Sequence, residues 1–324
     1  MTIIAHPHDF LGSDVFVDLR RIVGRSLFLK CEGFNFGGSI KMRAAAGMVA
    51  AAKRDGILTD NSVLIESSSG NFGVALSAIA ASMDVPFVCV TDVNCNAASI
   101  AAMRAYGARV VVIDEPDEVG GYLKARLDRL HQSCAGDDRF VWLNQYTNAA
   151  NWRSHYDLTA PAILSTFPDL DVLFVGIGTG GTGMGCARYL SDVGSSVRVV
   201  AIDPEGSVSF GHPSGRRLIP GLGAGVRPAE LDTSLFDDLV RVSEIDSIRT
   251  CRTLAAKGLL FGGSTGTAVS GALSWLEHHD PDELLSSVCI SADLGERYLG
   301  TVYDDDWVRG NFGAAALELV PSGV

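Results

Sequence analysis

One structural unit, a strand followed by a glycine-rich turn, a helix and a second strand, is predicted twice in this sequence. The first copy spans residues 63–92 with its turn at 67–73, and the second spans 171–203 with its turn at 178–183. Buried strands joined through a helix run parallel, and an open parallel sheet binds its ligand where the strand order reverses. The repeat therefore predicts two parallel sheets, each with a ligand site at the carboxyl ends of its strands.

Short β-branched runs that alternate with helical stretches extend this arrangement along the chain. They predict strands at residues 63–65, 87–90, 109–113, 140–143, 172–175, 197–202 and 288–290. A chain of 324 residues is too long for one ordinary core. The predicted fold class is α/β with two doubly wound open-sheet domains, a smaller one at 40–148 and a larger one at 1–39 plus 149–324. Residues 204–228, which are rich in proline and glycine, are predicted to form a long loop.

Charge and composition exclude several classes of function. The net charge of −12 repels phosphate backbones, and the basic residues form no stripe, so no nucleic-acid partner is expected. No apolar run approaches the roughly 18 residues that cross a bilayer, and the N-terminus lacks the pattern of a secretion signal, so we expect a cytoplasmic protein without membrane contact. The seven cysteines are odd in number and widely spaced, which predicts neither a disulfide framework nor a metal site.

Lys41 is one of only five lysines in the chain, and it stands where a glycine-rich turn opens into an alanine-rich helix. An amine at a helix N-terminus and beside Arg43 loses its proton more easily, as a lysine that forms a Schiff base must. Taken alone, the segment favours the alternative of an ordinary lysine in a first helical turn.

The turn of the second repeat follows an apolar strand and opens a helix. Its residues are Gly178, Thr179, Gly180, Gly181 and Thr182. Backbone N–H groups and the helix dipole make such a turn an anion cradle, to which the threonine hydroxyls add donors. A dinucleotide site explains the same residues, because the glycines fit G-x-G-x-x-G and Asp203 ends the next strand where a nicotinamide enzyme keeps its ribose-binding acid. This unit alone leaves both interpretations open.

The turn of the first repeat concentrates hydrogen-bond donors at another helix N-terminus. Its residues are Ser67, Ser68, Ser69, Gly70 and Asn71. This density of donors suits a carboxylate, and the alternative is a serine cap on a satisfied turn. Ser264 lies in a similar glycine-flanked turn, which alone indicates only a capped helix.

Together these segments resemble the fold-type II pyridoxal-phosphate (PLP) enzymes, of the tryptophan synthase β-like fold, in the cysteine synthase and cystathionine β-synthase branch. Six segments carry the resemblance in the family's order: 35–43 for N-P-x-x-S-x-K-x-R, 68–73 for T-S-G-N-T-G, 145–151 for Q-F-x-N-P-x-N, 178–182 for G-T-G-G-T, 219–225 for I-x-G-I-G-A-G, and 262–266 for the serine motif at a strand end. The match at 178–182 is residue for residue, which favours PLP over a dinucleotide.

The resemblance implies a role for each segment, with PLP in the cleft between the two domains of a homodimeric enzyme. Lys41 would be the Schiff-base residue and the general base. The implied cofactor-binding residues are Lys41, Asn71, Gly178, Thr179, Gly180, Gly181, Thr182 and Ser264. The implied substrate-binding residues are Ser67, Ser68, Ser69, Gly70, Asn71, Gln145 and Gly221. Because Ser264, unlike an aspartate, carries no charge, we expect the pyridine nitrogen opposite it to stay unprotonated.

The implied reaction is β-replacement on an activated L-serine. Phe36, Met42, Phe72 and Ala149 depart from the usual cysteine synthase residues, and 206–221 resemble the staphyloferrin-type synthases of 2,3-diaminopropionate pathways. Those enzymes join O-phospho-L-serine to L-glutamate, giving N-(2-amino-2-carboxyethyl)-L-glutamate. Arg216 or Arg217 is the candidate for binding the additional anionic groups of these amino-acid substrates, against the alternative of a solvated surface pair.

Three other functions remain open at this stage. A cysteine synthase would use the same fold with sulfide as the nucleophile. A nicotinamide-dependent dehydrogenase would explain residues 178–203 but not the segment around Lys41. A catalytically inactive regulatory homologue would keep the fold, although the intact Lys41, Asn71 and Ser264 argue against it.

Overall fold

Two compact units make up the chain in the computed structural model, which describes residues 3–11, 15–68, 70–117 and 121–319. Unit 1 comprises Met1–Leu11 and Asn35–Asn151, and unit 2 comprises Gly12–Phe34 and Trp152–Val324. This division differs from the predicted one in that residues 1–11, 35–39 and 149–151 belong to the smaller unit. Packing gives the reason: Leu11 lies against the core of unit 1, and the short helix η1 (Pro7–Asp9) contacts two helices of that unit.

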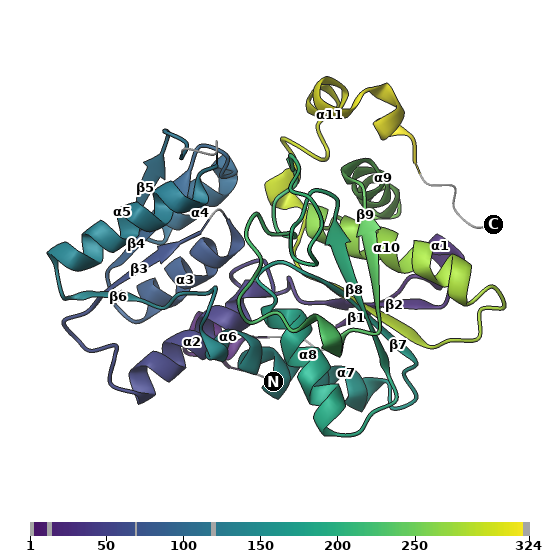
Figure 1. The fold of residues 1–324 in the computed structure, drawn as a ribbon, viewed down its shortest axis with the longest axis horizontal. Coiled ribbons are helices and arrows are strands. Elements are labelled where there is room, and N and C mark those ends of the chain that lie inside the picture. The colour runs from purple at the N-terminus through teal and green to yellow at the C-terminus, as the bar shows by residue number, and fades with distance from the viewer. Residues whose placement is uncertain (1–2, 12–14, 69, 118–120, 320–324) are drawn as a thin grey trace. The chain divides into compact units, whose positions relative to one another are not determined.

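A parallel four-stranded sheet forms the centre of unit 1, with the strand order β5-β4-β3-β6 (Figure 1). Its strands are β3 (Val63–Ser67), β4 (Phe87–Asp92), β5 (Arg109–Ile113) and β6 (Phe140–Trp142). β6 pairs with β3 in a register that sets Trp142 opposite Ile65. Each strand coincides with a predicted β-branched run.

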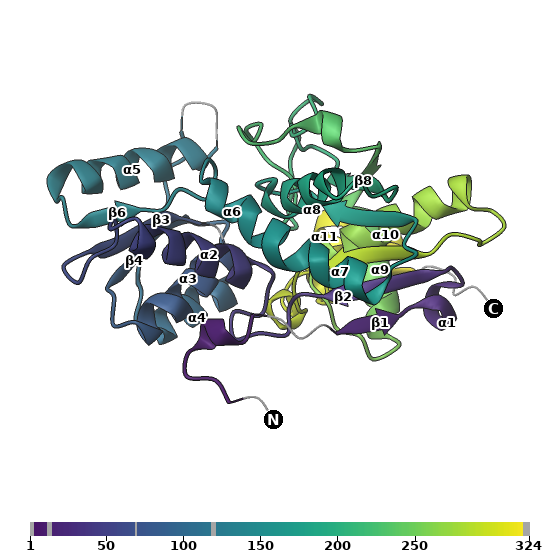
Figure 2. The ribbon, with the colours of Figure 1, turned by 90° about the horizontal axis from the view of Figure 1, so that it is seen from below.

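Helices cover both faces of this sheet (Figure 2). They are α2 (Lys41–Arg54), α3 (Asn71–Ser82), α4 (Ala97–Ala105) and α5 (Leu123–Gly136). On one face, Leu64 and Phe87 join a core with α2, α3 and α4. On the other face, Leu130 of α5 packs against Ile65 and Val90. The neighbours Leu64 and Ile65 thus point to opposite faces, as the geometry of a strand requires.

A six-stranded sheet with the order β1-β2-β10-β7-β8-β9 forms the centre of unit 2. Its strands are β1 (Phe16–Asp18), β2 (Leu27–Cys31), β7 (Val172–Gly176), β8 (Arg198–Pro204), β9 (Asp238–Val242) and β10 (Ser287–Ser291). Every pairing is parallel except that of the edge strand β1 with β2. The sequence patterns do not predict β1, β2 or β9, because β1 is only three residues long and charged side chains interrupt the other two.

Helices also cover both faces of the second sheet. The helical elements of this unit are α1 (Arg20–Val23), η2 (His155–Thr159), α7 (Ala160–Thr166), α8 (Gly181–Asp192), η3 (Thr233–Leu235), α9 (Glu244–Ala255), α10 (Gly263–His279), η4 (Glu296–Tyr298), α11 (Asp305–Phe312) and η5 (Ala314–Leu317), and α6 (Ala149–Ser154) contains the boundary between the units. Trp275 of α10 packs edge-on against Phe174, with ring centroids 5.5 Å apart. Leu173 and Val175, which alternate with Phe174, are buried on the other face, and α8 contacts their strand.

The strand order reverses once in each unit. In unit 1 the chain builds β3, β4 and β5 outward and then sets β6 on the other side of β3; in unit 2 it builds β7, β8 and β9 outward and then sets β10 on the other side of β7. Open parallel sheets bind ligands at the carboxyl ends of the strands that flank such a reversal. The serine-rich turn follows β3, and the turn at 178–182 follows β7.

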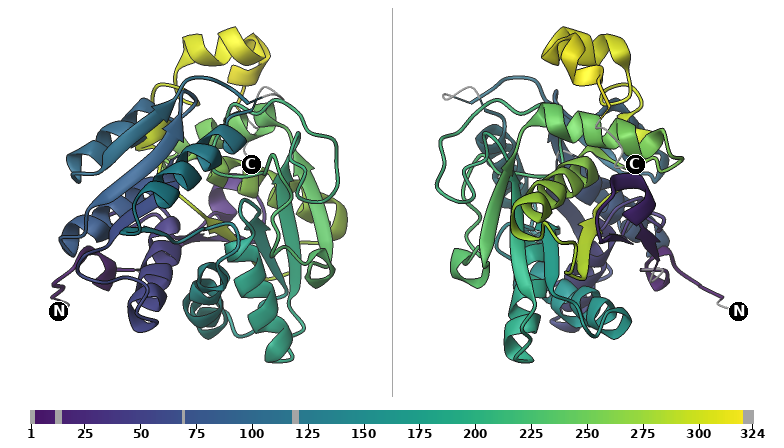
Figure 3. Two further views of the ribbon diagram at one scale, coloured as in Figure 1. Left: turned by 60° about the vertical axis from the view of Figure 1, so that its left-hand side comes forward. Right: turned by 90° about the vertical axis from the view of Figure 1, so that its right-hand side faces the viewer.

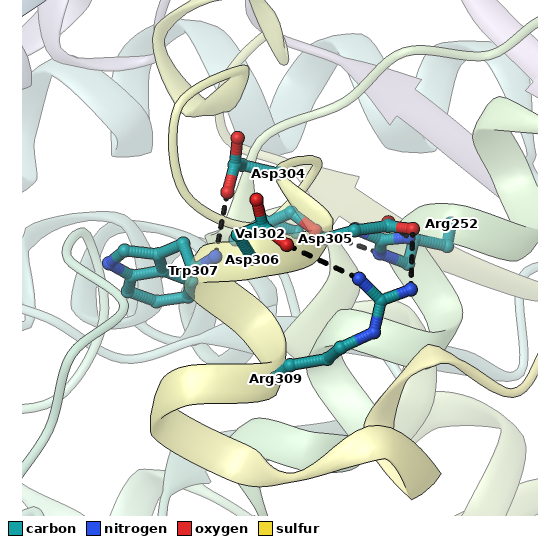
Figure 4. Close-up of polar contacts among 7 residues, drawn as sticks. All are labelled: Arg252, Val302, Asp304, Asp305, Asp306, Trp307 and Arg309. Carbon is teal, nitrogen blue, oxygen red and sulfur yellow. Dashed lines mark hydrogen bonds and ion pairs between the residues drawn. The ribbon is translucent and has the colours of Figure 1, made fainter.

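The C-terminal helices of unit 2 are the yellow segments of Figure 3, and η5 contacts α9. Arg252 of α9 donates hydrogen bonds to the Val302 carbonyl (2.9 Å) and to Asp305 Oδ1 (2.7 Å). Asp304 caps α11 by accepting from the Trp307 N–H at 2.6 Å (Figure 4). The two contacts of Arg252 connect α11 and the residues before it to α9.

The structure confirms the predicted α/β fold class with two open, mainly parallel sheets. Residues 205–232 contain neither helix nor strand, as the composition of the predicted loop implies. The seven cysteines are free thiols, and all but Cys134 are buried. Within the described residues, no helix is long and apolar enough to cross a membrane.

Candidate active site

Lys41 is the first residue of α2. The turn that precedes it is held by the side chain of Asn35. The Gly37 N–H donates to Asn35 Oδ1 (2.9 Å), and Asn35 Nδ2 donates to the Ser39 carbonyl (2.9 Å). Gly38 adopts φ +65°, where glycine is favoured. The fully buried Ser39 hydroxyl has no hydrogen-bond partner among the described residues. A bound group near Lys41 would satisfy that hydroxyl.

The serine-rich turn joins β3 to α3 at the reversal point of unit 1. Ser68 Oγ accepts hydrogen bonds from the N–H groups of Gly70 (3.3 Å) and Gly73 (2.9 Å). A serine hydroxyl has one hydrogen and two lone pairs, so these two contacts leave the hydrogen available for an anion. Asn71 begins α3, and Ser69 lies outside the described residues. This turn suits a carboxylate ligand.

Hydrogen bonds of Gln145 and Glu66 connect the carboxyl ends of β6 and β3, next to the serine-rich turn. Gln145 Nε2 donates to the Ser67 carbonyl (2.9 Å), which uses one of its two amide hydrogens. Trp142 Nε1 and the Ser67 N–H donate to Glu66 Oε1 (2.9 and 3.0 Å). Burial raises the pKa of the Glu66 carboxyl to about 7. A buried acid with a pKa near neutrality thus immediately precedes the serine-rich turn and accepts a hydrogen bond from its first residue.

The turn after β7 has the backbone geometry of an anion cradle. Gly180, the N-cap of α8, adopts φ +90°. Residues other than glycine rarely adopt this conformation. The first hydrogen bond of the helix joins the Met184 N–H to the Gly180 carbonyl (2.8 Å), so the N–H groups of residues 181–183 precede the ladder. A phosphate group matches these donors and the positive end of the helix dipole.

The buried His155 contacts this cradle through the side chain of Thr182. His155 lies in η2, a π-helical turn that packs against α8. Its Nε2 is 3.4 Å from Thr182 Oγ1, and its Nδ1 is 3.0 Å from Thr159 Oγ1. Gly185 permits the close approach, because a Cβ there would collide with the Trp152 carbonyl. The contact with His155 orients the Thr182 hydroxyl at the mouth of the cradle.

Gly221 links the cradle to the N-terminus of α10 within unit 2. A Cβ on Gly178 would lie 3.1 Å from the Gly221 carbonyl, and a Cβ on Gly221 would lie 3.1 Å from Ser264 Cβ. Gly221 has φ +110°, and the neighbouring Gly223 N–H donates to the Ile177 carbonyl (2.7 Å). The loop therefore bridges the turn after β7 and the first turn of α10, bringing two predicted site segments together.

Ser264 is the second residue of α10 and is almost completely buried. Its hydroxyl donates to Asp293 Oδ1 at 2.5 Å, and Tyr298 donates to the other oxygen of the same carboxylate at 2.5 Å. Asp293 follows β10, the strand beside β7 at the reversal point. Ser264, which the sequence predicts as a site residue, is therefore hydrogen-bonded to the buried carboxylate of Asp293.

The two candidate arginines differ in their surroundings. Arg216 is exposed, whereas Arg217 is half-buried and donates to the Leu222 carbonyl (3.5 Å). Burial lowers the pKa of Arg217, and the charges of Asp203 and Glu244 oppose that shift. Asp203 itself lies buried beneath the loop, where burial raises the pKa of its carboxyl to about 6. It is thus part of the support for the loop.

Each unit gathers its own share of the predicted site residues. Unit 1 brings Ser67, Ser68 and Gln145 together at its reversal point. It also contains Lys41 and Asn71, the first residues of α2 and α3, and these two helices contact each other. Unit 2 brings together residues 178–182, Gly221 and Ser264.

Sequence reasoning missed several supporting side chains. They are Glu66, His155, Asp293 and Tyr298. Glu66 and Asp293 could have been found from the sequence, because each of these carboxylates lies at the carboxyl end of a strand beside a reversal point. Within the described residues, no group of His, Cys, Asp or Glu could hold a metal ion.

Comparisons with known proteins identify the family and several relatives of the chain. The family described as "Pyridoxal-phosphate dependent enzyme" matches residues 16–291. An N-(2-amino-2-carboxyethyl)-L-glutamate synthase from Cupriavidus metallidurans is 36% identical over 330 residues, 97% of each chain. A hydrogen sulfide-producing enzyme from Fusobacterium nucleatum is 32% identical with a TM-score of 0.85, over 92% of this chain and 100% of that one. An O-acetylserine-dependent cystathionine β-synthase from Helicobacter pylori is 28% identical with a TM-score of 0.83, over 93% and 99%.

Proposed function

The chain belongs to the family of pyridoxal-phosphate-dependent enzymes, and from that premise we propose that it joins O-phospho-L-serine to L-glutamate. The product would be N-(2-amino-2-carboxyethyl)-L-glutamate, a precursor for 2,3-diaminopropionate. PLP-dependent β-replacement on an activated serine is the reaction class of its relatives and of this chain. The observation that carries the substrate proposal is the synthase of that name, which matches 97% of both chains.

The residues present fit PLP. The glycine-rich cradle at 178–182 suits its phosphate, and the buried Ser39 hydroxyl beside Lys41 is unsatisfied among the described residues. When bound, PLP supplies an electron sink for the carbon that loses its proton. Lys41 would hold the cofactor covalently and then move that proton, while Asn71 and Ser264 would contact the ring. Borohydride reduction with peptide mapping tests this assignment: label on another lysine would move the site.

A carboxylate-binding role for the serine-rich turn follows from its hydrogen bonds. Ser68 keeps its hydroxyl hydrogen, and Gln145 keeps one amide hydrogen, after their contacts within unit 1. Both would donate to the α-carboxylate of the activated serine, together with Ser67, Ser69 and Gly70. Substrate orientation by several fixed donors favours the geometry in which the α-proton faces the base.

Arg216 is the candidate for binding the phosphate leaving group of O-phosphoserine. Arg217 is directed to Leu222 and faces the charge of Asp203, whereas the neighbouring Arg216 is exposed in the same loop. A guanidinium binds a phosphate through paired, charge-assisted hydrogen bonds, which an acetyl ester could not use. We therefore assign the O-phosphoserine phosphate to Arg216 and the support of the loop to Arg217.

Substrate competition provides the deciding experiment. The kcat/KM for O-phosphoserine and for O-acetylserine would be measured with glutamate and, separately, with sulfide as nucleophile. We expect O-phosphoserine with glutamate to give the highest value and an adduct of the expected mass. Preference for O-acetylserine with sulfide, and no glutamate adduct, would make the protein a cysteine synthase. The homodimer implied by the resemblance stays a prediction, which sedimentation would test.

A further inference from the structure

The turn that precedes Lys41 is also held by a tyrosine from a distant part of unit 1. The Gly38 N–H donates to the Asn35 carbonyl (3.0 Å), which closes a β-turn with Phe36 at its second position. Tyr106, the C-cap residue of α4, donates from its hydroxyl to the Phe36 carbonyl (3.0 Å), although the two residues are 70 positions apart. This hydrogen bond connects the turn to the end of α4.

A ring contact holds the same residue from the N-terminal segment. The rings of Phe10 and Phe36 meet edge to face, with centroids 6.4 Å apart. Phe10 directly follows η1, which contacts α2 and α3, and the next residue, Leu11, packs against the core of unit 1. Because Phe36 is itself 54% exposed, its position depends on these two contacts more than on burial.

The identity of residue 36 explains why such contacts matter. The second position of a common β-turn has a φ near −60°, which the ring of proline enforces and phenylalanine does not. Among the described residues, the Phe36 N–H has no hydrogen-bond partner, so proline at this position would remove no hydrogen bond. Phe10 and Tyr106 therefore supply through tertiary contacts a restraint that proline would supply locally.

The restraint reaches Lys41 through a short hydrogen-bonded segment. Asn35 Nδ2 donates to the Ser39 carbonyl (2.9 Å), and the Met42 N–H donates to the same carbonyl (3.2 Å). The side chain that shapes the turn and the backbone that starts α2 thus share one acceptor. The position of Lys41 at the start of the helix consequently depends on the conformation of the turn.

We propose that Tyr106 and Phe10 are positioning residues that prepare Lys41 for covalent attachment of PLP. This inference rests on the proposed role of Lys41. In the attachment, the amine nitrogen forms a C=N bond with the aldehyde carbon of PLP, and the aldehyde oxygen leaves as water with the two amine hydrogens. A fixed approach of the amine favours this step, whereas a turn that samples other conformations slows it.

Two measurements on the full-length chain test the proposal, and the first needs no cofactor. In the apoprotein, Tyr106→Phe should speed the hydrogen exchange of the Gly38 N–H about two- to tenfold, the range that one ordinary hydrogen bond supports. Stopped-flow absorbance should show that PLP attaches to this variant more slowly by a similar factor. Tyr189→Phe, which changes a half-buried tyrosine of unit 2, is the control and should alter neither rate.

Phe36→Pro provides a rescue that a general loss of stability would not show. Because it restrains the turn locally, the double variant Tyr106→Phe with Phe36→Pro should recover the wild-type exchange and attachment rates. Phe10→Ala should slow attachment in the wild-type background. Alongside Phe36→Pro it should have no effect, since the ring that it contacts is then absent.

Three results would overturn the proposal while leaving the cofactor site intact. They are unchanged exchange of the Gly38 N–H in Tyr106→Phe, faster exchange with an unchanged attachment rate, and a double variant that stays as slow as Tyr106→Phe. Attachment of PLP to another lysine, found by peptide mapping after borohydride reduction, would overturn the proposed cofactor site and this inference with it. The exchange rates would then still report whether Tyr106 holds the turn.

Discussion

Individual residues of this protein acquire their properties from burial more than from their own chemistry. Glu66 and Asp203 are acids whose pKa burial raises to about 7 and about 6. Arg217 and its neighbour Arg216 are chemically identical but are half-buried and exposed, respectively. Ser264 lies at the start of a helix, and its buried hydroxyl donates a hydrogen bond to Asp293.

Arg216→Gln tests the assignment of the phosphate leaving group. We expect kcat/KM for O-phosphoserine to fall about 10- to 100-fold, since a hydrogen bond to a charged group contributes roughly 1.5–3 kcal/mol. The value for O-acetylserine should change little. Arg227→Gln removes another exposed arginine of the same loop and serves as the control. Equal effects of the two substitutions would exclude a specific role for Arg216.

Glu66→Gln should change how stability depends on pH. The folded state raises the pKa of Glu66 from about 4.5 to about 7, so its contribution to stability is full below pH 4.5 and is lost as the pH rises through 7. This window corresponds to about 3 kcal/mol. The neutral glutamine lacks the titration, so the drop in Tm between pH 5 and pH 8 should be smaller than in the wild type.

The exposed Glu115 in the same unit provides the control for that experiment. Glu115→Gln should retain the wild-type drop in Tm. If Glu66→Gln shows the same drop as well, the Glu66 carboxyl is ionised throughout this pH range in the folded protein.

At the scale of elements, the site residues lie at the starts of helices and the ends of strands. Lys41, Asn71 and Gly181 each begin a helix, and Ser264 is one residue further along. The helix N-terminus supplies unpaired N–H groups and a partial positive charge, whatever the sequence of the rest of the helix. The reversal of strand order then decides which of these termini share a location.

The helix that follows the cradle offers a matched pair of glycines. Gly180 precedes α8 with φ +90°, and Gly194 follows it with φ +65°. Alanine at either position should cost roughly 1–2 kcal/mol of stability because of the left-handed backbone. Only Gly180→Ala should also disturb the cradle, weakening PLP binding by about tenfold. Fluorescence titration of the apoprotein measures the affinity, and equal affinities in both variants would locate the phosphate elsewhere.

For the whole molecule, the division into two units predicts a change in cooperativity. The proposed cofactor residues come from both, with Lys41 in unit 1 and residues 178–182 in unit 2. Calorimetry should therefore resolve separate unfolding transitions in the apoprotein and a single one at higher temperature with PLP, whose midpoint rises with PLP concentration. In Lys41→Ala, the transitions should stay separate. Identical traces with and without PLP would argue that the units do not share the cofactor.

The sequence by itself determined the fold class, the strands with β-branched runs and the turns with glycine or serine, because local backbone geometry depends on local residues. It did not determine β1, β2 and β9, which are strands only because their neighbours in the sheet pair with them. Likewise, the motifs marked Ser264 and the cradle, but only the tertiary structure set Asp293 and Tyr298 behind Ser264 and His155 behind Thr182. The contacts of Ser264 with Asp293 and of Thr182 with His155 join residues that are 29 and 27 positions apart, and a hydrogen bond across such separations is decided by how the strands and helices pack.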